Sequence, residues 1–456
     1  MLLLALVLDL STATVAPPPK PTVLEAKAAQ IVVEEVEKRS RLRWTIGTTR
    51  EGVPSIEFHR GSAPEEGFSI RTSGTHIEIT AADGRGMIFG AGRLLRELRM
   101  SRDHVELPGD FTLTSAPKVK LRGHQLGYRP KTNSYDGWTA AMWDEYMRDL
   151  VVFGTNAIEL IPPRSDDAPD SPHFPLPQMP MMIEMSRSAA SYGMAVWVWM
   201  PALEKDYTDP KAVERSLQEW GDVFRHLPRV DAVMVPGGDP GHTAPKPLMA
   251  LLEKQTEVLH RFHPKAQMWV SPQGFSKEWA EEFFAILRAE PKWLTGVVHG
   301  PQVRESLPEL RRLVPARYPI RNYPDITHSV FCQFAVPDWD LAYELTHARE
   351  SINPRPRDMR AIVRNSLADT VGFITYSEGC NDDVNKFVWS ALGWDPDTDL
   401  ARMLREYARY FVGPQFETEV EQGIFGLEQN WRGAVATNAS IEPTYQLFHR
   451  LEQSAT

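Results

Sequence analysis

The sequence predicts a (β/α)8 barrel that is preceded by a small α/β domain and followed by a helical region. Between residues 118 and 398, short apolar runs alternate with longer amphipathic segments, which is typical of βα units around a parallel sheet. Eight such runs lie within about 260 residues, the size of one closed barrel. The alternative is an open doubly wound sheet, but no Gly-x-Gly-x-x-Gly motif opens a helix after the first run. We therefore predict the barrel.

Residues 1–19 resemble an export signal. The apolar run "LLLALVL" is followed by Thr14-Val15-Ala16 and then by three prolines, as in a hydrophobic region with its cleavage site. No Lys or Arg precedes the run, and Asp9 interrupts it. The run is too short to span a bilayer. We therefore expect a secreted or periplasmic bacterial protein with no integral membrane segment.

Residues 20–117 predict the small α/β domain. Helical periodicity over residues 22–40 is followed by three alternating strand patterns, "SIEFHR", "GFSIRTSG" and "THIEITAAD". Helical spacing returns in "GRGMIFGAGRLLRELRM", and the domain closes on "FTLTSAP". The order is helix, strands, helix.

Residues 118–398 predict the barrel domain. The strands in chain order are "KLRGHQL", "AIELIPP", "AVWVWMP", "AVMVPGG", "QMWVSPQ", "GVVHGP", "PIRNYPD" and "GFITYSEG". Residues 399–456 continue with helical patterns such as "DLARMLREYARYFVG" and "TYQLFHRLEQ". The chain ends within such a pattern, so we expect the C-terminal helical region to be incomplete.

Charge and composition narrow the range of partners. A formal charge of −10 argues against a nucleic-acid or anionic-membrane partner. Thirteen Trp and twelve Tyr fill cores in many proteins, but they also form platforms on which sugar rings stack. The two cysteines, Cys332 and Cys380, are too few for a disulfide scaffold or a zinc site, although they follow neighbouring strands and could pair. The oligomeric state is not indicated.

Barrel active sites lie at the carboxyl ends of the strands, so residues near those ends are candidates for substrate contacts. They are rich in aromatic, amide and charged side chains. The predicted substrate-binding residues are Arg122, His124, Tyr128, Glu159, Trp199, His299, Asn322, Tyr323, His328, Tyr376 and Asp382. The sequence has no Gly-x-Ser-x-Gly, phosphate-loop or His-Glu-x-x-His motif, and it implies no organic cofactor or metal.

Three carboxylates are the candidate catalytic groups: Asp239 and Glu378 as a first pair, with Asp325 in reserve. Cleavage of a glycosidic bond needs two carboxylates, one of which is protonated. A pocket lined with Trp and Tyr around such a pair predicts a carbohydrate-active enzyme.

Several candidates have a structural alternative. Asp239 and Asp325 follow turn-forming residues, and Asp382 is suited to cap a helix. His299 and His328 could be structural hydrogen-bonding groups. Glu159 lies within a buried strand, where an unpaired charge is costly. It is therefore either paired with an Arg such as Arg122 or part of the site.

The segment "GFSIRTSGTHIEITAADGRGMIFGAGRLLREL" resembles the small domain that precedes the barrel in family 20 β-hexosaminidases, α-glucuronidases and α-N-acetylglucosaminidases. "KLRGHQLGYRP" resembles the start of their first barrel strand. "GFITYSEGCNDDVNK" is similar to the last-strand segment of related barrels, including family 163 endo-acting N-acetylglucosaminidases. The resemblance covers roughly residues 22–395 and implies a glycoside hydrolase.

The segment after the fourth strand departs from the family pattern. Family 20 enzymes carry an adjacent Asp-Glu pair there, in which Glu is the acid and Asp orients the substrate's acetamido group. This sequence reads Gly238-Asp239-Pro240. Either Asp239 has the acid role or the acid comes from elsewhere, with Glu378 as the best candidate.

The sequence therefore predicts a glycoside hydrolase that acts on glycans containing N-acetylhexosamine or uronic acid, resembling either β-N-acetylhexosaminidases or α-glucuronidases. A non-catalytic glycan-binding barrel is the alternative. A metal-dependent hydrolase is a third hypothesis, and it requires His242 and His328 to converge on Asp239.

Overall fold

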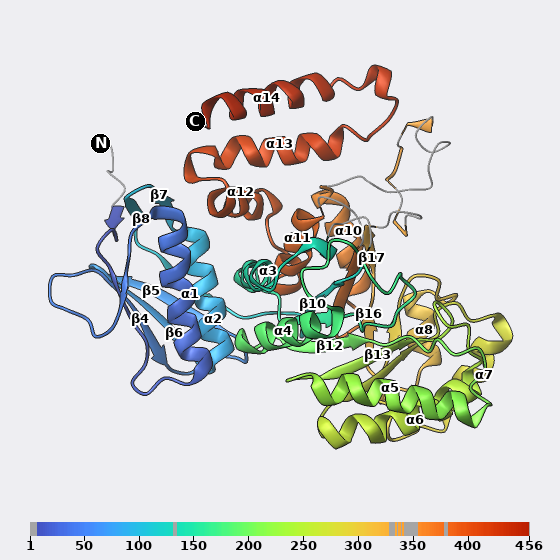
Figure 1. The fold of residues 1–456 in the computed structure, drawn as a ribbon. Helices are drawn as coiled ribbons and strands as arrows, with labels where there is room; N and C mark the ends of the chain where they lie inside the picture. The colour runs from blue at the N-terminus through green and yellow to red at the C-terminus, as the bar shows by residue number, and fades with distance from the viewer. Residues whose placement is uncertain are drawn as a thin grey trace.

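A computed structural model describes residues 7–130, 135–327, 333–334, 336–338, 340–341, 354–377 and 382–455. These residues form a small α/β domain, a barrel and a set of C-terminal helices (Figure 1). None of the described helices has the length and apolar character needed to cross a membrane.

The small domain packs two helices against a mixed sheet. Its elements are β1 (Val7–Asp9), β2 (Thr14–Ala16), α1 (Val23–Ser40), β3 (Thr45–Ile46), β4 (Ser55–Arg60), β5 (Phe68–Ser73), β6 (His76–Ala81), α2 (Gly84–Glu97), β7 (Arg99–Ser101), β8 (His104–Pro108) and β9 (Thr112–Ser115). The main sheet has the order β3-β2-β4-β6-β5-β9, and β1, β8 and β7 form a second, smaller sheet. The predicted helix, strands and helix are all present.

The apolar N-terminal run belongs to this domain. Strand β1 pairs with β8, and β2 pairs with β3 and β4 in the main sheet. The side chains of Leu10 and Val15 are fully buried. Residues 7–16 are therefore part of the folded domain, contrary to the signal-like segment predicted for residues 1–19, and the localisation inferred from that segment stays a prediction.

In the described part of the chain, eight parallel strands close into the predicted barrel. They are β10 (Leu121–Leu126), β11 (Ala157–Leu160), β12 (Ala195–Trp199), β13 (Ala232–Pro236), β14 (Gln267–Ser271), β15 (Gly296–His299), β16 (Ile320–Asn322) and β18 (Gly372–Ser377). Pairing of β10 with β18 closes the barrel, and the short strand β17 (Asp325–Thr327) also pairs with β18. All eight strands agree with the sequence prediction.

Helices surround the barrel and begin at recognisable sequence signals. They are α3 (Ala140–Val152), α4 (Gln178–Ser191), α5 (Pro210–His226), α6 (Pro245–Phe262), α7 (Lys277–Arg288), α8 (Leu307–Leu313), α10 (Pro356–Ser366) and α11 (Asp383–Trp394). Asp209 caps α5, whose first residue is Pro210, and the Ser276 hydroxyl caps α7. Such residues satisfy or remove the unpaired N–H groups of a first helical turn.

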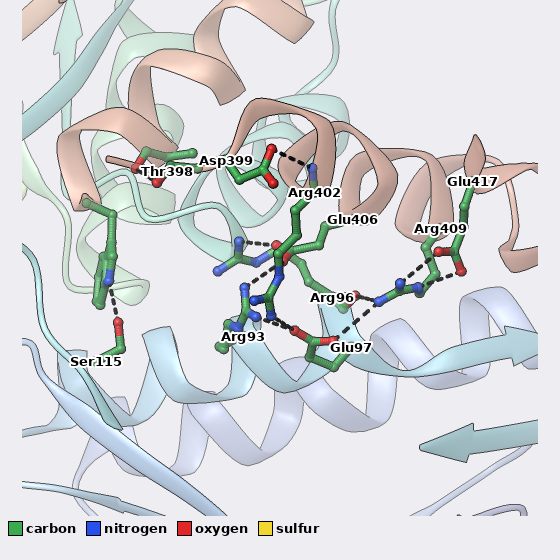
Figure 2. A network of polar contacts seen from close by, with 12 residues as sticks. Arg93, Arg96, Glu97, Ser115, Thr398, Asp399, Arg402, Glu406, Arg409 and Glu417 are labelled. Carbon is green, nitrogen blue, oxygen red and sulfur yellow. Dashed lines mark hydrogen bonds and ion pairs between the residues drawn. The ribbon is translucent and has the colours of Figure 1, made fainter. Parts of the chain in front are cut away.

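The C-terminal helices are α12 (Leu400–Phe411), α13 (Glu417–Gln429) and α14 (Ile441–Ser454), stacked one above the other in Figure 1. An ion-pair network fixes α12 to α2 of the small domain (Figure 2). The buried Glu406 carboxylate accepts hydrogen bonds from Arg93 and Arg96, each at 2.8 Å, and from Arg402 at 3.1 Å. Burial alone would raise the pKa of Glu406, but the Arg96, Arg93 and Arg402 charges outweigh it and lower that pKa.

A second buried cluster joins α1, α3 and α12. The Tyr410 hydroxyl oxygen lies 2.8 Å from the Glu35 carboxylate and 3.3 Å from the Asp149 carboxylate. Burial, together with the nearby Glu35 charge, raises the pKa of Asp149 to about 7. Asp149 is therefore protonated over a pH range in which an unfolded Asp is ionised.

This cluster predicts a pH-dependent stability. A raised native pKa stabilises the fold below about pH 4, and that contribution is lost as the pH rises from about 4 to 7. Asp149→Asn, which cannot ionise, is expected to be more stable than wild type at pH 8, by on the order of 2 kcal/mol, and to differ little near pH 4. Urea unfolding at pH 4.5 and pH 8 measures both, with the exposed Asp222→Asn as control. An equal effect of Asp149→Asn at the two pH values would contradict the assignment.

Candidate functional site

A layer of buried polar side chains crosses the barrel interior near the carboxyl ends of the strands. The Glu159 carboxylate pairs with the Arg321 guanidinium at 2.5 and 3.2 Å, and both side chains are fully buried. The Gln125 amide donates to Glu159 and to the Tyr323 hydroxyl, each at 2.9 Å. The sequence predicted that Glu159 is either paired with an arginine or part of the site. It is paired, but its partner is Arg321 rather than Arg122.

The predicted residue Tyr323 links this layer to the side chains above it. Burial, with a contribution from Glu159, raises the pKa of Tyr323 well above its usual value, so its hydroxyl stays protonated. Its ring lies 5.9 Å from that of Tyr376. Tyr323 and Tyr376 are therefore neighbouring rings, and their role in binding a sugar stays a prediction.

Arg129, which was not among the predicted site residues, lies between Tyr376 and Trp199. Its guanidinium donates to the Tyr376 hydroxyl at 3.1 Å, and its centre is 5.7 Å from the Tyr376 ring and 5.9 Å from the Trp199 ring. The Asp167 carboxylate at 2.8 Å balances its charge, and Asp166 lies at 3.4 Å. The only sequence signal for Arg129 is its position just after the first strand, in "GYRP".

Asp239 lies at the carboxyl end of β13, on the same side of the barrel. Its carboxylate accepts a hydrogen bond from the Gln302 amide, which was also not predicted. Its carbonyl oxygen accepts from the Gln273 amide at 3.4 Å. Gly238 permits this arrangement, because a Cβ there would lie 2.9 Å from the Gln273 carbonyl oxygen. The double glycine before Asp239 thus lets the ends of β13 and β14 approach closely.

Gln273 and Tyr323 both face Gly300 at the end of β15. A Cβ on Gly300 would lie 2.9 Å from the Gln273 side-chain oxygen and 3.1 Å from the Tyr323 ring. That Gln273 oxygen is buried and has no hydrogen-bond partner within the described part of the chain. It is therefore a buried acceptor whose hydrogen-bonding capacity is unused by the described residues.

His299 and Asn322 are register partners on β15 and β16. His299 Nε2 lies 3.2 Å from the Glu305 carbonyl oxygen. Burial lowers the pKa of His299, although the Asn322 side chain and the Glu305 carbonyl oppose this shift. A neutral His299 donates one hydrogen bond and accepts another.

The other predicted carboxylates have different outcomes. Asp325 is buried in β17 opposite Tyr376, and its backbone N–H donates to the Gln333 side chain at 2.7 Å. Glu378 and His328, as well as Cys332 and Cys380, lie outside the described residues. The proposed pairing of Glu378 with Asp239 therefore stays a prediction.

Arg122 and His124 do not face the site, contrary to the prediction. Both are fully buried and point outward from β10, because their inward neighbours are Gly123 and Gln125. Arg122 donates to Glu66 of the small domain at 2.6 Å.

His124 contacts the hydroxyls of Thr375 and Ser390 at 2.7 and 2.8 Å, and burial lowers its pKa well below the usual value. Arg122 and His124 thus hold the barrel to its neighbouring elements.

Asp382 and Tyr128 also have structural contacts. Asp382 is buried beside Lys386 at 3.0 Å, and burial raises the pKa of Asp382 although the Lys386 charge opposes this. The Tyr128 hydroxyl donates to the Leu176 carbonyl at 2.7 Å, and its ring stacks on Phe174. We assign both residues to packing of the loops and helices around the site.

The described residues offer no group of three or more His, Cys, Asp and Glu side chains that could hold a metal ion. His242 is exposed, and its ring packs on Trp279 at 4.7 Å. The metal hypothesis depends also on His328, which lies outside the described residues.

No family model matches the sequence, and no curated protein matches it either. Solved structures do match the fold. A Streptomyces plicatus β-hexosaminidase in complex with GlcNAc is similar with a TM-score of 0.63 at 12% identity, over 91% of this chain and 93% of that chain. A family 20 β-N-acetylhexosaminidase from Streptomyces coelicolor A3(2) is similar with a TM-score of 0.63 at 12% identity, over 90% and 93% of the two chains.

A family 138 enzyme targeting pectin rhamnogalacturonan II is similar with a TM-score of 0.56 at 13% identity, over 91% of this chain and 55% of that chain. These structural neighbours are glycoside hydrolases. The chain therefore shares the fold of the family 20 β-hexosaminidases, a barrel with a small α/β domain before it, as the sequence resemblance implied.

Proposed function

We propose that the chain is a glycoside hydrolase whose sugar-binding site is the cluster at the carboxyl ends of the barrel strands. The observation that carries this proposal is that Arg129, Tyr376 and Tyr323 adjoin one another, and that Gly300 lies between Tyr323 and Gln273, whose amide reaches Asp239. Aromatic faces stack on sugar rings, and amide and guanidinium groups bind hydroxyls. The fold's glycosidase neighbours support the same class.

Among the two substrate classes expected, the site favours N-acetylhexosamine over uronic acid. A uronate needs a cation for its carboxylate, but the Arg129 guanidinium is already balanced by Asp167 at 2.8 Å and by Asp166 at 3.4 Å. A neutral sugar needs instead the hydrogen-bonding groups that Gln273 and His299 provide. We therefore assign the chain to N-acetylhexosaminide hydrolysis.

Asp239 is the described carboxylate best placed for a direct chemical role. It is part-exposed at the end of β13, whereas Glu159 is fully buried in an ion pair. In the proposed mechanism Asp239 donates a proton to the leaving oxygen, or fixes the substrate's acetamido group so that its oxygen attacks the sugar carbon. Glu378 supplies the second carboxylate in the first case.

A panel of 4-nitrophenyl glycosides of both anomers tests the proposal: N-acetylglucosaminide, N-acetylgalactosaminide and glucuronide. We expect release of 4-nitrophenol from an N-acetylhexosaminide and none from the glucuronides. Calorimetric binding of N-acetylglucosamine without hydrolysis of any glycoside would favour the glycan-binding barrel instead. If the protein neither bound N-acetylglucosamine nor hydrolysed any of these glycosides, the proposal would be refuted.

A further inference from the structure

A cavity of about 550 Å³ opens at the opposite end of the barrel, where the strands begin. Its volume is that of a small-molecule site. Residues at the starts of all eight strands line it: Leu121, Asn156, Ala195, Ala232, Gln267, Thr295, Pro319 and Val371. Trp197 and Trp269 lie one inward position further along their strands and form the floor, with ring centres 5.3 Å apart. The cavity is separate from the site that carries the proposed function.

The hollow exists because small side chains occupy inward positions at this end. Barrel interiors are usually filled by Val, Ile and Leu in successive layers. Here Ala195 and Ala232 occupy such positions, and neither reaches across the barrel axis. The two indoles fill the next layer, so the floor is aromatic and the walls above it are mostly apolar.

Almost all charged side chains at the mouth of the cavity are in ion pairs. Arg85 pairs with Glu65 at 2.9 Å, and Asp231 pairs with Arg229 at 2.6 Å. Glu66, the other acid on the rim, accepts from Arg122 and Arg85. The rim acids therefore leave no uncompensated negative charge.

The two lysines of the rim differ. Lys118 pairs with Asp395 at 2.7 Å. Lys120 is exposed, and within the described part of the chain it has no carboxylate at ion-pair distance. On the opposite side of the mouth, at the start of β14, the Gln267 side-chain oxygen accepts from the Trp269 indole N–H at 2.9 Å. The rim thus carries one lysine without an ion-pair partner above an aromatic floor.

We propose that this cavity binds a small aromatic organic anion, an aryl carboxylate or sulfonate. Its ring packs against Trp197 and Trp269, and its anionic group faces the Lys120 ammonium at the rim. The mostly apolar walls suit a sugar poorly, because a sugar needs several directed hydrogen bonds.

A titration of the full-length protein with 8-anilinonaphthalene-1-sulfonate tests the proposal. The expected result is saturable one-site binding with enhanced dye fluorescence. Lys120→Gln is expected to weaken binding about tenfold, the effect of one charge-assisted hydrogen bond. Lys118→Gln, on the same rim but paired with Asp395, is the matched control and is expected to bind as wild type. Ala195→Phe, which fills the mouth, is expected to abolish binding.

Thermal unfolding of each variant shows whether a change in dye fluorescence comes from the cavity or from a destabilised fold. If Ala195→Phe does not fold, Lys120→Gln still tests the proposal, because Lys120 is exposed and its replacement is not expected to affect folding. Equal dye binding by wild type, Lys120→Gln and Ala195→Phe would overturn the proposal. Displacement of the dye by N-acetylglucosamine would also overturn it, because the dye would then occupy the sugar site. Competition by benzoate but not by benzyl alcohol would support it.

Discussion

Replacing Glu159 with alanine is expected to lower the free energy of unfolding by about 3–5 kcal/mol, the usual cost of removing one partner of a buried ion pair. The substitution leaves the Arg321 guanidinium charged, fully buried and without its carboxylate. It also removes one acceptor of the Gln125 amide, whose other bond holds the Tyr323 hydroxyl. Urea or guanidinium unfolding followed by tryptophan fluorescence measures the loss.

The double variant Glu159→Leu/Arg321→Met separates the charge from the packing. Replacing both partners by apolar groups of similar size is often close to neutral, so the double variant is expected to be more stable than Glu159→Ala. If Glu159→Ala had the same free energy of unfolding as wild type, the buried ion pair would contribute nothing to the stability of the barrel. If the double variant were the less stable of the two, the loss would come from packing and not from the unpaired charge.

The order of strands and helices was predictable because each buried parallel strand is a short apolar run between turn signals. "AVWVWMP" and "QMWVSPQ" illustrate this, and both form strands where expected. The N-terminal run was wrongly assigned for the same reason. A short buried strand and the hydrophobic region of an export signal have similar composition, and only Asp9 and the absence of a basic residue before the run distinguished them.

Which side of each strand faces the barrel interior was not predictable. A strand buried on both faces shows no alternation of apolar and polar residues, so His124 and Gln125 look equally suited to a site. The structure directs Gln125 inward and His124 outward, where it reaches Ser390 of α11. Likewise, the partner of Glu159 depends on how the strands are staggered around the barrel, and this places Arg321 on β16 beside it.

Asp239→Asn is expected to lower kcat for the best N-acetylhexosaminide by about 10²-fold or more, the usual contribution of a general acid or base. The amide keeps the shape of the side chain and its place beside Gln302, so the change removes charge and proton transfer with little effect on packing. Asp222→Asn is the matched control, because Asp222 is an exposed residue on α5, paired with Arg225, and is expected to leave kcat unchanged.

The choice of leaving group distinguishes the two roles open to Asp239. A 4-nitrophenolate leaves without protonation, whereas a sugar hydroxyl needs a proton donor. If Asp239 is the general acid, the loss is larger for a disaccharide of N-acetylglucosamine than for the nitrophenyl glycoside. If Asp239 instead orients the acetamido group, the attacking step weakens equally for both substrates. Full activity of Asp239→Asn on both would exclude either role and transfer the acid function to another carboxylate, with Glu378 as the first to test.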